Sequence, residues 1–255
     1  MRQTQIIMGM PITVEIPGPD GEASEAADAL EAVFAYLRQV DETFSTYKES
    51  SEISRINRGE LGLSDSSEDV RTVFALSQQT REETGGYFAI WRDGHCDPSG
   101  LVKGWAIHNA EALLQERGYR DYYIDAGGDI ALGGLKDGRA WRVGIRNPFN
   151  RAEIVKALTV TNLGVATSGT AIRGQHIYDP HQPGILASDI VSLTVIGPNV
   201  YEADRFATAG FAMGRRGISF IELLPGFEGY QIDTHGMATY TSGFERYIVA
   251  YAERN

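Results

Sequence analysis

Apolar residues recur at three- and four-residue intervals in the stretch that follows Ser24. The recurring positions are Leu30, Val33, Phe34, Leu37, Val40 and Phe44. This spacing places them on one face of a helix, and the hydroxyl of Ser24 is suited to cap its N-terminus. Because burial of one large apolar side chain contributes about 1.5–3 kcal/mol, the pattern predicts a long helix packed against the core.

Shorter patterns predict the remaining elements. Ile12, Val14 and Ile16 alternate with polar residues, as is typical of a strand. We expect further helices at about 67–84, 103–117, 202–213 and 218–224. Further strands are expected at 122–125, 141–145, 158–161, 176–178, 191–196 and 230–234. Helices inserted among strands predict an α+β fold, with one compact domain over residues 1–255 that is either undivided or built as two subdomains.

Charge and cysteine content exclude several classes of protein. The 255 residues carry 23 basic and 34 acidic side chains, a formal net charge of −11, and no cluster of Lys and Arg of the kind that binds nucleic acid. Cys96 is the only cysteine, so the chain can form neither an intrachain disulfide nor a site with several thiolates. The sequence has no signal peptide, lipid-attachment signal or apolar run of the ~18 residues that span a bilayer, so we expect cytoplasmic localisation.

Two glycine-containing segments are candidates for ligand contact. The segment Asp125-Ala126-Gly127-Gly128-Asp129 leaves an expected strand in a glycine pair, which either exposes backbone amides to a flat or anionic ligand or makes a tight turn. It lacks the G-x-G-x-x-G pattern of dinucleotide-binding folds. Gly169 and Gly174 have the spacing of a phosphate-binding P-loop, but Gln175 replaces the required lysine, so no P-loop is predicted.

Asp204 and Thr208 are four residues apart on an expected helix and therefore share one face. A carboxylate and a hydroxyl are hard oxygen ligands that suit Mg²⁺. The same residues also fit a purely structural role, with Asp204 favouring the helix dipole and Thr208 bonding the preceding turn.

His176, Asp97 and Lys103 are further candidates. With an ordinary pKa near ~6.5, His176 is suited to general-base catalysis, although a structural hydrogen bond explains it equally. Asp97 and Lys103 flank the opening of an expected helix, where an anion is favoured and Lys103 would reach a phosphate. The alternative is an aspartate turn followed by a solvated lysine.

Taken in chain order, these segments resemble the FAD:protein FMN transferase (ApbE) family. The matching stretches are 8–10, 41–47, 51–57, 84–88, 97–105, 125–129, 166–169, 176–180, 191–195, 203–204 and Thr208. Members of that family bind FAD, use Mg²⁺ to break its pyrophosphate, attach FMN to a Ser or Thr of an acceptor flavoprotein and release AMP. Some members hydrolyse FAD to FMN and AMP instead, and a non-catalytic FAD-binding protein is the remaining alternative.

The resemblance implies a set of site residues. The metal ligands would be the main-chain oxygen of Gly100, the carboxylate of Asp204 and the hydroxyl of Thr208. His176 would accept the proton of the acceptor hydroxyl, and Lys103 would add positive charge. FAD would contact Met8, Tyr47, Tyr87, Phe88, Ala89, Asp97, Lys103 and Leu186, with Ile185 as an alternative to Leu186.

The sequence departs from the family pattern at several positions. Met10 replaces the usual threonine after Met-Gly, and Ala207 stands where several members have a further aspartate on the metal side. The lipid-anchored export signal that is common in the family is absent, so the resemblance leaves the acceptor protein and the compartment open.

Overall fold

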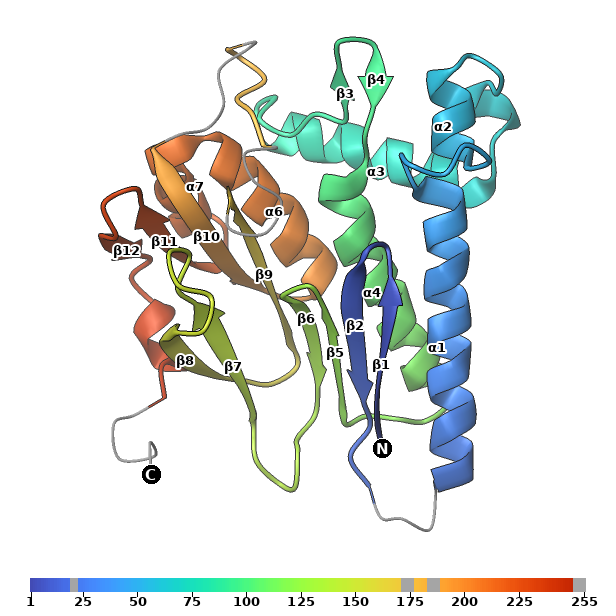
Figure 1. Ribbon diagram of the computed structural model, residues 1–255. Coiled ribbons are helices and arrows are strands. Elements are labelled where there is room, and N and C mark those ends of the chain that lie inside the picture. The colour runs from blue at the N-terminus through green and yellow to red at the C-terminus, as the bar shows by residue number, and fades with distance from the viewer. Residues whose placement is uncertain (19–22, 171–176, 183–188, 250–255) are drawn as a thin grey trace.

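The central feature of the fold is an eight-stranded sheet in which all neighbouring strands are antiparallel (Figure 1). The computed structural model describes residues 1–18, 23–170, 177–182 and 189–249. In spatial order the strands are β1 (Arg2–Ile7), β2 (Met10–Glu15), β5 (Tyr122–Ala126), β6 (Asp129–Gly133), β9 (Leu163–Gly169), β10 (Ile190–Gly197), β11 (Glu228–Asp233) and β12 (Ala238–Tyr240). Two separate hairpins are formed by β3 (Trp91–Arg92) with β4 (His95–Cys96) and by β7 (Trp141–Arg146) with β8 (Ile154–Val160).

Helices cover one face of this sheet. The α-helices are α1 (Ala23–Phe44), α2 (Glu52–Asn57), α3 (Glu68–Glu83), α4 (Ser99–Glu116), α6 (Val200–Ala212) and α7 (Gly217–Glu222). Short 3-10 turns are η2 (Leu63–Asp65), η3 (Gly214–Arg216) and η4 (Phe244–Tyr247). Helices α4 and α6 pack against each other and against the sheet, and α1 packs on α4 (Figure 1).

The sheet separates distinct apolar cores. Alternation along β10 turns Leu193 and Val195 toward α6, where they pack with Phe206. Ile196 on the opposite face belongs to the core beneath the β7–β8 hairpin, together with Trp141. The hairpin and the helix layer therefore lie on opposite sides of the same strands.

The α+β fold agrees with the sequence prediction, and most helices begin and end within a few residues of the expected positions. Helix α4 begins at Ser99 rather than near Lys103, directly after a turn in which the carboxylate of Asp97 accepts the Ser99 N–H at 3.0 Å. Strands β1, β3, β4, β6, β9 and β12 and helix α2 are additional to the prediction.

The expected strand at 176–178 is wrong over its described part. His176 lies outside the described residues, and Ile177 and Tyr178 belong to no named strand. The carboxylate of Asp179 accepts the N–H of His181 at 2.9 Å, so the chain turns directly after Tyr178 instead of extending.

Gly164 of β9 lies directly beneath the start of α6, where an added Cβ would be 2.1 Å from the backbone nitrogen of Val200. Gly164→Ala should therefore destabilise the fold by about 1–3 kcal/mol, because backbone cannot yield as a flexible side chain does. Thermal unfolding should show a midpoint several degrees lower. Gly18→Ala, where an added Cβ meets no atom within 4 Å, is the matched control, and equal midpoints for both variants would contradict the assigned contact.

Candidate active site

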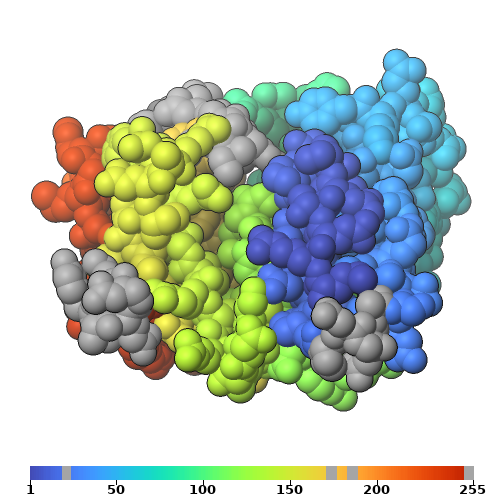
Figure 2. Space-filling view, turned by 60° about the horizontal axis from the view of Figure 1, so that its bottom comes forward, coloured from blue at the N-terminus to red at the C-terminus, as the bar shows by residue number. Residues whose placement is uncertain are grey.

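A cavity of about 1020 Å³ lies between the β1–β2 hairpin and the β7–β8 hairpin, and its floor includes residues of α4 and α6. Figure 2 shows the hollow between the dark blue and yellow-green hairpins. Every described residue that the sequence predicts for the site lines this cavity, with one exception. These lining residues are Met8, Tyr87, Phe88, Ala89, Asp97, Gly100, Lys103, Asp204 and Thr208.

The exception is Tyr47. Its side chain is 95% exposed in the loop after α1, and it is not among the residues that line the cavity. Within the described residues, the aromatic side chains that line the cavity are those of Tyr87, Phe88, Tyr123 and Tyr178. His176, Leu186 and its alternative Ile185 lie outside the described residues, so their expected roles stay predictions.

The floor of the cavity is built where α4 and α6 approach closely. Asp204 and Thr208 lie one turn apart on α6 and face the first turns of α4. The Thr208 hydroxyl donates to the carbonyl oxygen of Gly100 at 3.2 Å, and the Gly104 N–H donates to Oδ2 of Asp204 at 2.8 Å. A Cβ at Gly104 would lie 2.6 Å from the Cβ of Asp204, so the approach requires glycine there.

Three ionisable side chains, those of Lys103, Asp129 and Asp204, lie together at this floor. Asp129, the first residue of β6, is fully buried, and its Oδ1 accepts the Thr167 N–H at 3.0 Å. Its Oδ2 forms an ion pair with the ammonium of Lys103. Asp204 is 3% exposed, and burial raises its pKa well above the usual value. Repulsion from Asp129 raises this pKa further, while Lys103 and the Gly104 N–H lower it.

The oxygen atoms of Gly100, Asp204 and Thr208 fit a hard divalent cation. The pKa of Asp204 is raised because the nearby positive charge does not offset the cost of burying the ionised carboxylate. A bound cation would supply further positive charge. Within the described ranges, no three His, Cys, Asp or Glu residues converge on a common point, so the candidate set has few anionic ligands. This composition suits Mg²⁺, which commonly combines one or two carboxylates with water and substrate phosphates.

The walls of the cavity carry an excess of positive charge, although the whole chain is acidic. The basic lining residues are Arg2, Arg92, Lys103, Arg142, Arg146 and Arg151, and the acidic ones are Asp97, Asp125 and Asp204. Arg142 and Arg146 occupy alternate, exposed positions of β7 and so extend from one face of the hairpin. A cavity with this balance of charge attracts an anionic ligand.

The glycine pair after β5 forms the expected tight turn, since Ala126 pairs with Asp129 across a two-residue connection. Gly127 and Gly128 have φ angles of 63° and 101°, which side chains disfavour. Both glycines line the cavity, so contact between their backbone and a ligand stays a prediction.

Sequence patterns do not single out Asp129 or the β7 arginines as site residues. Asp129 lies inside the glycine-containing segment 125–129. Arg142 lies in the expected strand at 141–145, and Arg146 directly follows it. The signal for the arginines is the alternation of side chains along a strand, which places both on one face of β7. For Asp129 the available signal is its place directly after the strand turn, but its partners come from distant parts of the chain.

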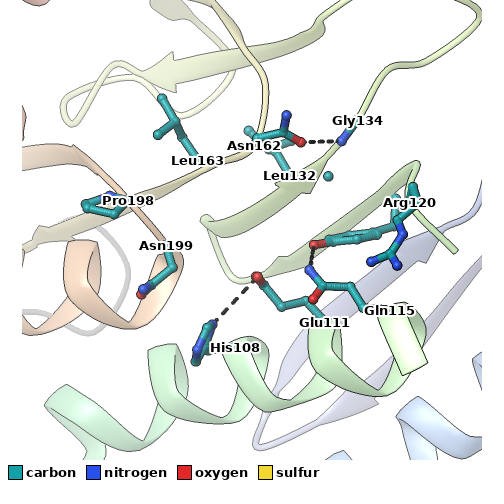
Figure 3. Close-up of a pocket in the computed structure, with 12 residues that line it drawn as sticks. His108, Glu111, Gln115, Arg120, Leu132, Gly134, Asn162, Leu163, Pro198 and Asn199 are labelled. Carbon is teal, nitrogen blue, oxygen red and sulfur yellow. Dashed lines mark hydrogen bonds and ion pairs between the residues drawn. The ribbon is translucent and has the colours of Figure 1, made fainter. Parts of the chain in front are cut away.

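A second cavity, of about 590 Å³, lies beside the C-terminal half of α4 (Figure 3). Nδ1 of His108 is 3.6 Å from a carboxylate oxygen of Glu111, and this neighbouring carboxylate raises the pKa of the His108 imidazole. Gln115 donates to the Tyr122 hydroxyl at 2.6 Å. None of the described residues predicted for the active site lines this cavity.

Comparison with known proteins gives the same architecture. A solved flavin transferase ApbE from Vibrio cholerae has a TM-score of 0.81 at 22% identity, covering 97% of this chain and 98% of that chain. The solved ApbE protein from Thermotoga maritima has a TM-score of 0.83 at 19% identity, covering 98% and 99%. The fold is thus that of solved flavin transferases.

The family is shown by sequence. The ApbE family model matches residues 8–93 and 90–230, so the chain belongs to the ApbE family. A curated relative, the FAD:protein FMN transferase of Vibrio cholerae serotype O1, is 31% identical over 139 residues, or 50% of this chain and 42% of the relative. That of Salmonella typhimurium is 27% identical over 158 residues, or 54% and 45%. The matches thus span less than half the length of these relatives. In the part of the chain that the structure describes, no helix has the length and apolar content that a membrane crossing requires.

The raised pKa of Asp204 predicts how the stability of the folded protein depends on pH. Because folding raises the pKa of Asp204, the metal-free protein loses stability as the pH rises above about 4, the ordinary aspartate value, and up to the raised pKa. Asp204→Asn removes the charge and keeps an oxygen for the Gly104 N–H. We therefore expect metal-free Asp204→Asn to unfold at a higher temperature than wild type near pH 7.

Calorimetry across pH checks this expectation. The difference between the two proteins should disappear near pH 4, where the unfolded aspartate also becomes protonated. Added Mg²⁺ should stabilise the wild type more than the variant. A wild type that unfolds at the higher temperature near pH 7 without metal would contradict the effect of burial on Asp204.

Proposed function

We propose that this protein transfers FMN from FAD to a Ser or Thr hydroxyl of an acceptor flavoprotein and releases AMP, with Mg²⁺ bound at Gly100, Asp204 and Thr208. The observation that carries the proposal is that Thr208 bonds the Gly100 carbonyl while Asp204, one turn away on α6, bonds Gly104, with Lys103 in the same wall of a basic cavity. Membership of the ApbE family and the names of its curated relatives support the same activity.

The residues of the floor would bind the diphosphate of FAD. Bound Mg²⁺ would supply charge neutralisation on the pyrophosphate oxygens. Lys103 lines the cavity and would place its ammonium against the same oxygens, while the basic walls attract the dinucleotide. Tyr87, which is half-buried and lines the cavity, offers an aromatic ring against which a flat ring would pack. Tyr87 is itself held by the Arg216 guanidinium, which donates to its hydroxyl.

The transfer breaks the phosphoanhydride bond of the FAD diphosphate and forms a phosphoester bond to the acceptor. The acceptor oxygen forms a bond to the phosphorus of the FMN half, and the bond from that phosphorus to the bridging oxygen breaks, so the bridging oxygen leaves with AMP. The proton of the acceptor hydroxyl would pass to the imidazole of His176, a role that rests on the family resemblance because His176 lies outside the described residues. In such reactions the protein mainly positions groups and stabilises charge.

The assay mixes the protein with FAD, Mg²⁺ and a flavoprotein that carries a Ser/Thr-Gly-Ala-Ser/Thr segment, and reads covalent flavin fluorescence on a denaturing gel. Asp204→Ala and Thr208→Val should each lower the labelling rate, Asp204→Ala by on the order of 10²-fold or more, because transition-state charge loses its counterion. Asp233→Asn is the matched control, since Asp233 pairs with Arg215 and does not line the cavity.

Two outcomes would count against this proposal. Full labelling by Asp204→Ala would remove the assigned metal site. Release of free FMN and AMP at the same rate with and without an acceptor would show that water, rather than a hydroxyl of a protein, is the natural nucleophile.

His176→Ala should slow transfer by about 10²–10⁴-fold near neutral pH, because the acceptor hydroxyl loses its general base. The deficit should shrink as the pH rises and solvent hydroxide replaces the imidazole. Binding of FAD, measured by quenching of flavin fluorescence, should change little, since the base acts on the acceptor. A variant as fast as wild type at every pH would exclude His176 as the base.

A further inference from the structure

Asp129 is buried without being part of the cavity surface. Its neighbours Gly128 and Ile130 line the cavity, but Asp129 does not, and its side chain has no exposed area. Burial of a carboxylate is costly unless charged and hydrogen-bonded partners compensate it. Its compensating partners include the Thr167 N–H on β9 and the Lys103 ammonium on α4, and the Asp204 carboxyl on α6 lies beside it.

Lys103 is the group through which Asp129 reaches the cavity. Its side chain is 17% exposed and lines the cavity wall one turn after Gly100. The next residue, Gly104, donates its N–H to Asp204. The ion pair therefore fixes the ammonium beside the oxygen atoms assigned to the metal, before any ligand arrives.

We propose that Asp129 is a positioning residue, whose carboxylate holds the Lys103 ammonium at the cavity floor in the orientation that meets the diphosphate of FAD. A lysine side chain is long and flexible, so an unpaired ammonium would have to be ordered during binding or reaction. An anchor that is already in place removes this requirement. This inference rests on the proposed function and adds a residue that acts through Lys103, apart from its direct electrostatic effect on Asp204.

The competing explanation is structural, because a carboxylate that joins α4, β6 and β9 would also stabilise the fold. Asp129→Asn separates the two. Asparagine keeps an oxygen for the Thr167 N–H and nearly the same volume, but it removes the charge that holds Lys103. Loss of a group that orients a site residue typically lowers activity by about 10–100-fold, and we expect a loss of this size in kcat. The KM for the acceptor protein should stay unchanged.

A double-mutant cycle provides the decisive measurement. Lys103→Gln, Asp129→Asn and the double variant are compared in the FAD-dependent labelling assay. If Asp129 acts through Lys103, the double variant should be no slower than Lys103→Gln alone. In Lys103→Gln the ammonium is already absent, so loss of the Asp129 charge has no further effect. Losses that multiply would overturn the inference, since they would show that Asp129 acts independently of Lys103.

The matched control is Glu228→Gln. Glu228 is also a buried carboxylate, 8% exposed, and it pairs with the Arg246 guanidinium at 3.0 Å, but it does not line the cavity. This variant should lower the thermal midpoint without lowering kcat. A loss of kcat in Glu228→Gln as large as that in Asp129→Asn would overturn the inference, because any buried charge would then have the same effect.

Failure of this inference is distinguishable from failure of the proposed function. If Lys103→Gln keeps full activity, the assigned role of Lys103 in the reaction is wrong, and so is the positioning role of Asp129. If Lys103→Gln is slow but Asp129→Asn is not, only the positioning role is wrong.

A measurement on the wild-type protein applies even if Asp129→Asn fails to fold. The side-chain ammonium resonance of Lys103, assigned with Lys103→Gln, should be visible in ¹⁵N-detected spectra without FAD, because a buried, ion-paired ammonium exchanges slowly. An ammonium that becomes visible only after FAD is added would overturn the inference.

Discussion

The close approach of α4 to α6 at Gly104 is the constraint on which the site depends. It brings a main-chain N–H of one helix onto a carboxylate of the other, and one turn along each helix it brings the Thr208 hydroxyl to the Gly100 carbonyl. Helices with larger side chains at these positions would be held further apart, since packed helix axes normally lie 8–10 Å from one another. The oxygen ligands are therefore a product of helix packing rather than of a dedicated loop.

This packing also concentrates charge where water does not reach. Asp129 and Asp204 are both buried, and Lys103 lies near both as a compensating cation. If both carboxyl groups are ionised, the three groups carry net negative charge, which opposes folding, raises the pKa of Asp204 and favours binding of a further cation. The cavity walls above it are basic, so the site is prepared for a cation at its floor and an anion above.

Sequence patterns predict those parts of the fold that have one buried face. The apolar stripe of α1 and the alternation around Ile12 correspond to a helix and a strand in the structure. Strands β6 and β9 are harder to predict because all five residues of β6 are buried, and β9 is rich in small residues with no alternation. The family resemblance predicts the residues around the cavity, but the partnership of Asp129 with Lys103 depends on tertiary contacts that no local pattern reports.

The two side walls of the cavity rest on different apolar cores. Ile12 and Val14 of the β1–β2 hairpin pack with α1 and α4, whereas Val143 and Ile145 of the β7–β8 hairpin pack with the opposite half of the sheet. Loosening of one core would therefore widen the gap while the other half keeps its native packing. On gradual heating, the protein can thus lose its ability to bind a dinucleotide before circular dichroism detects any loss of helix.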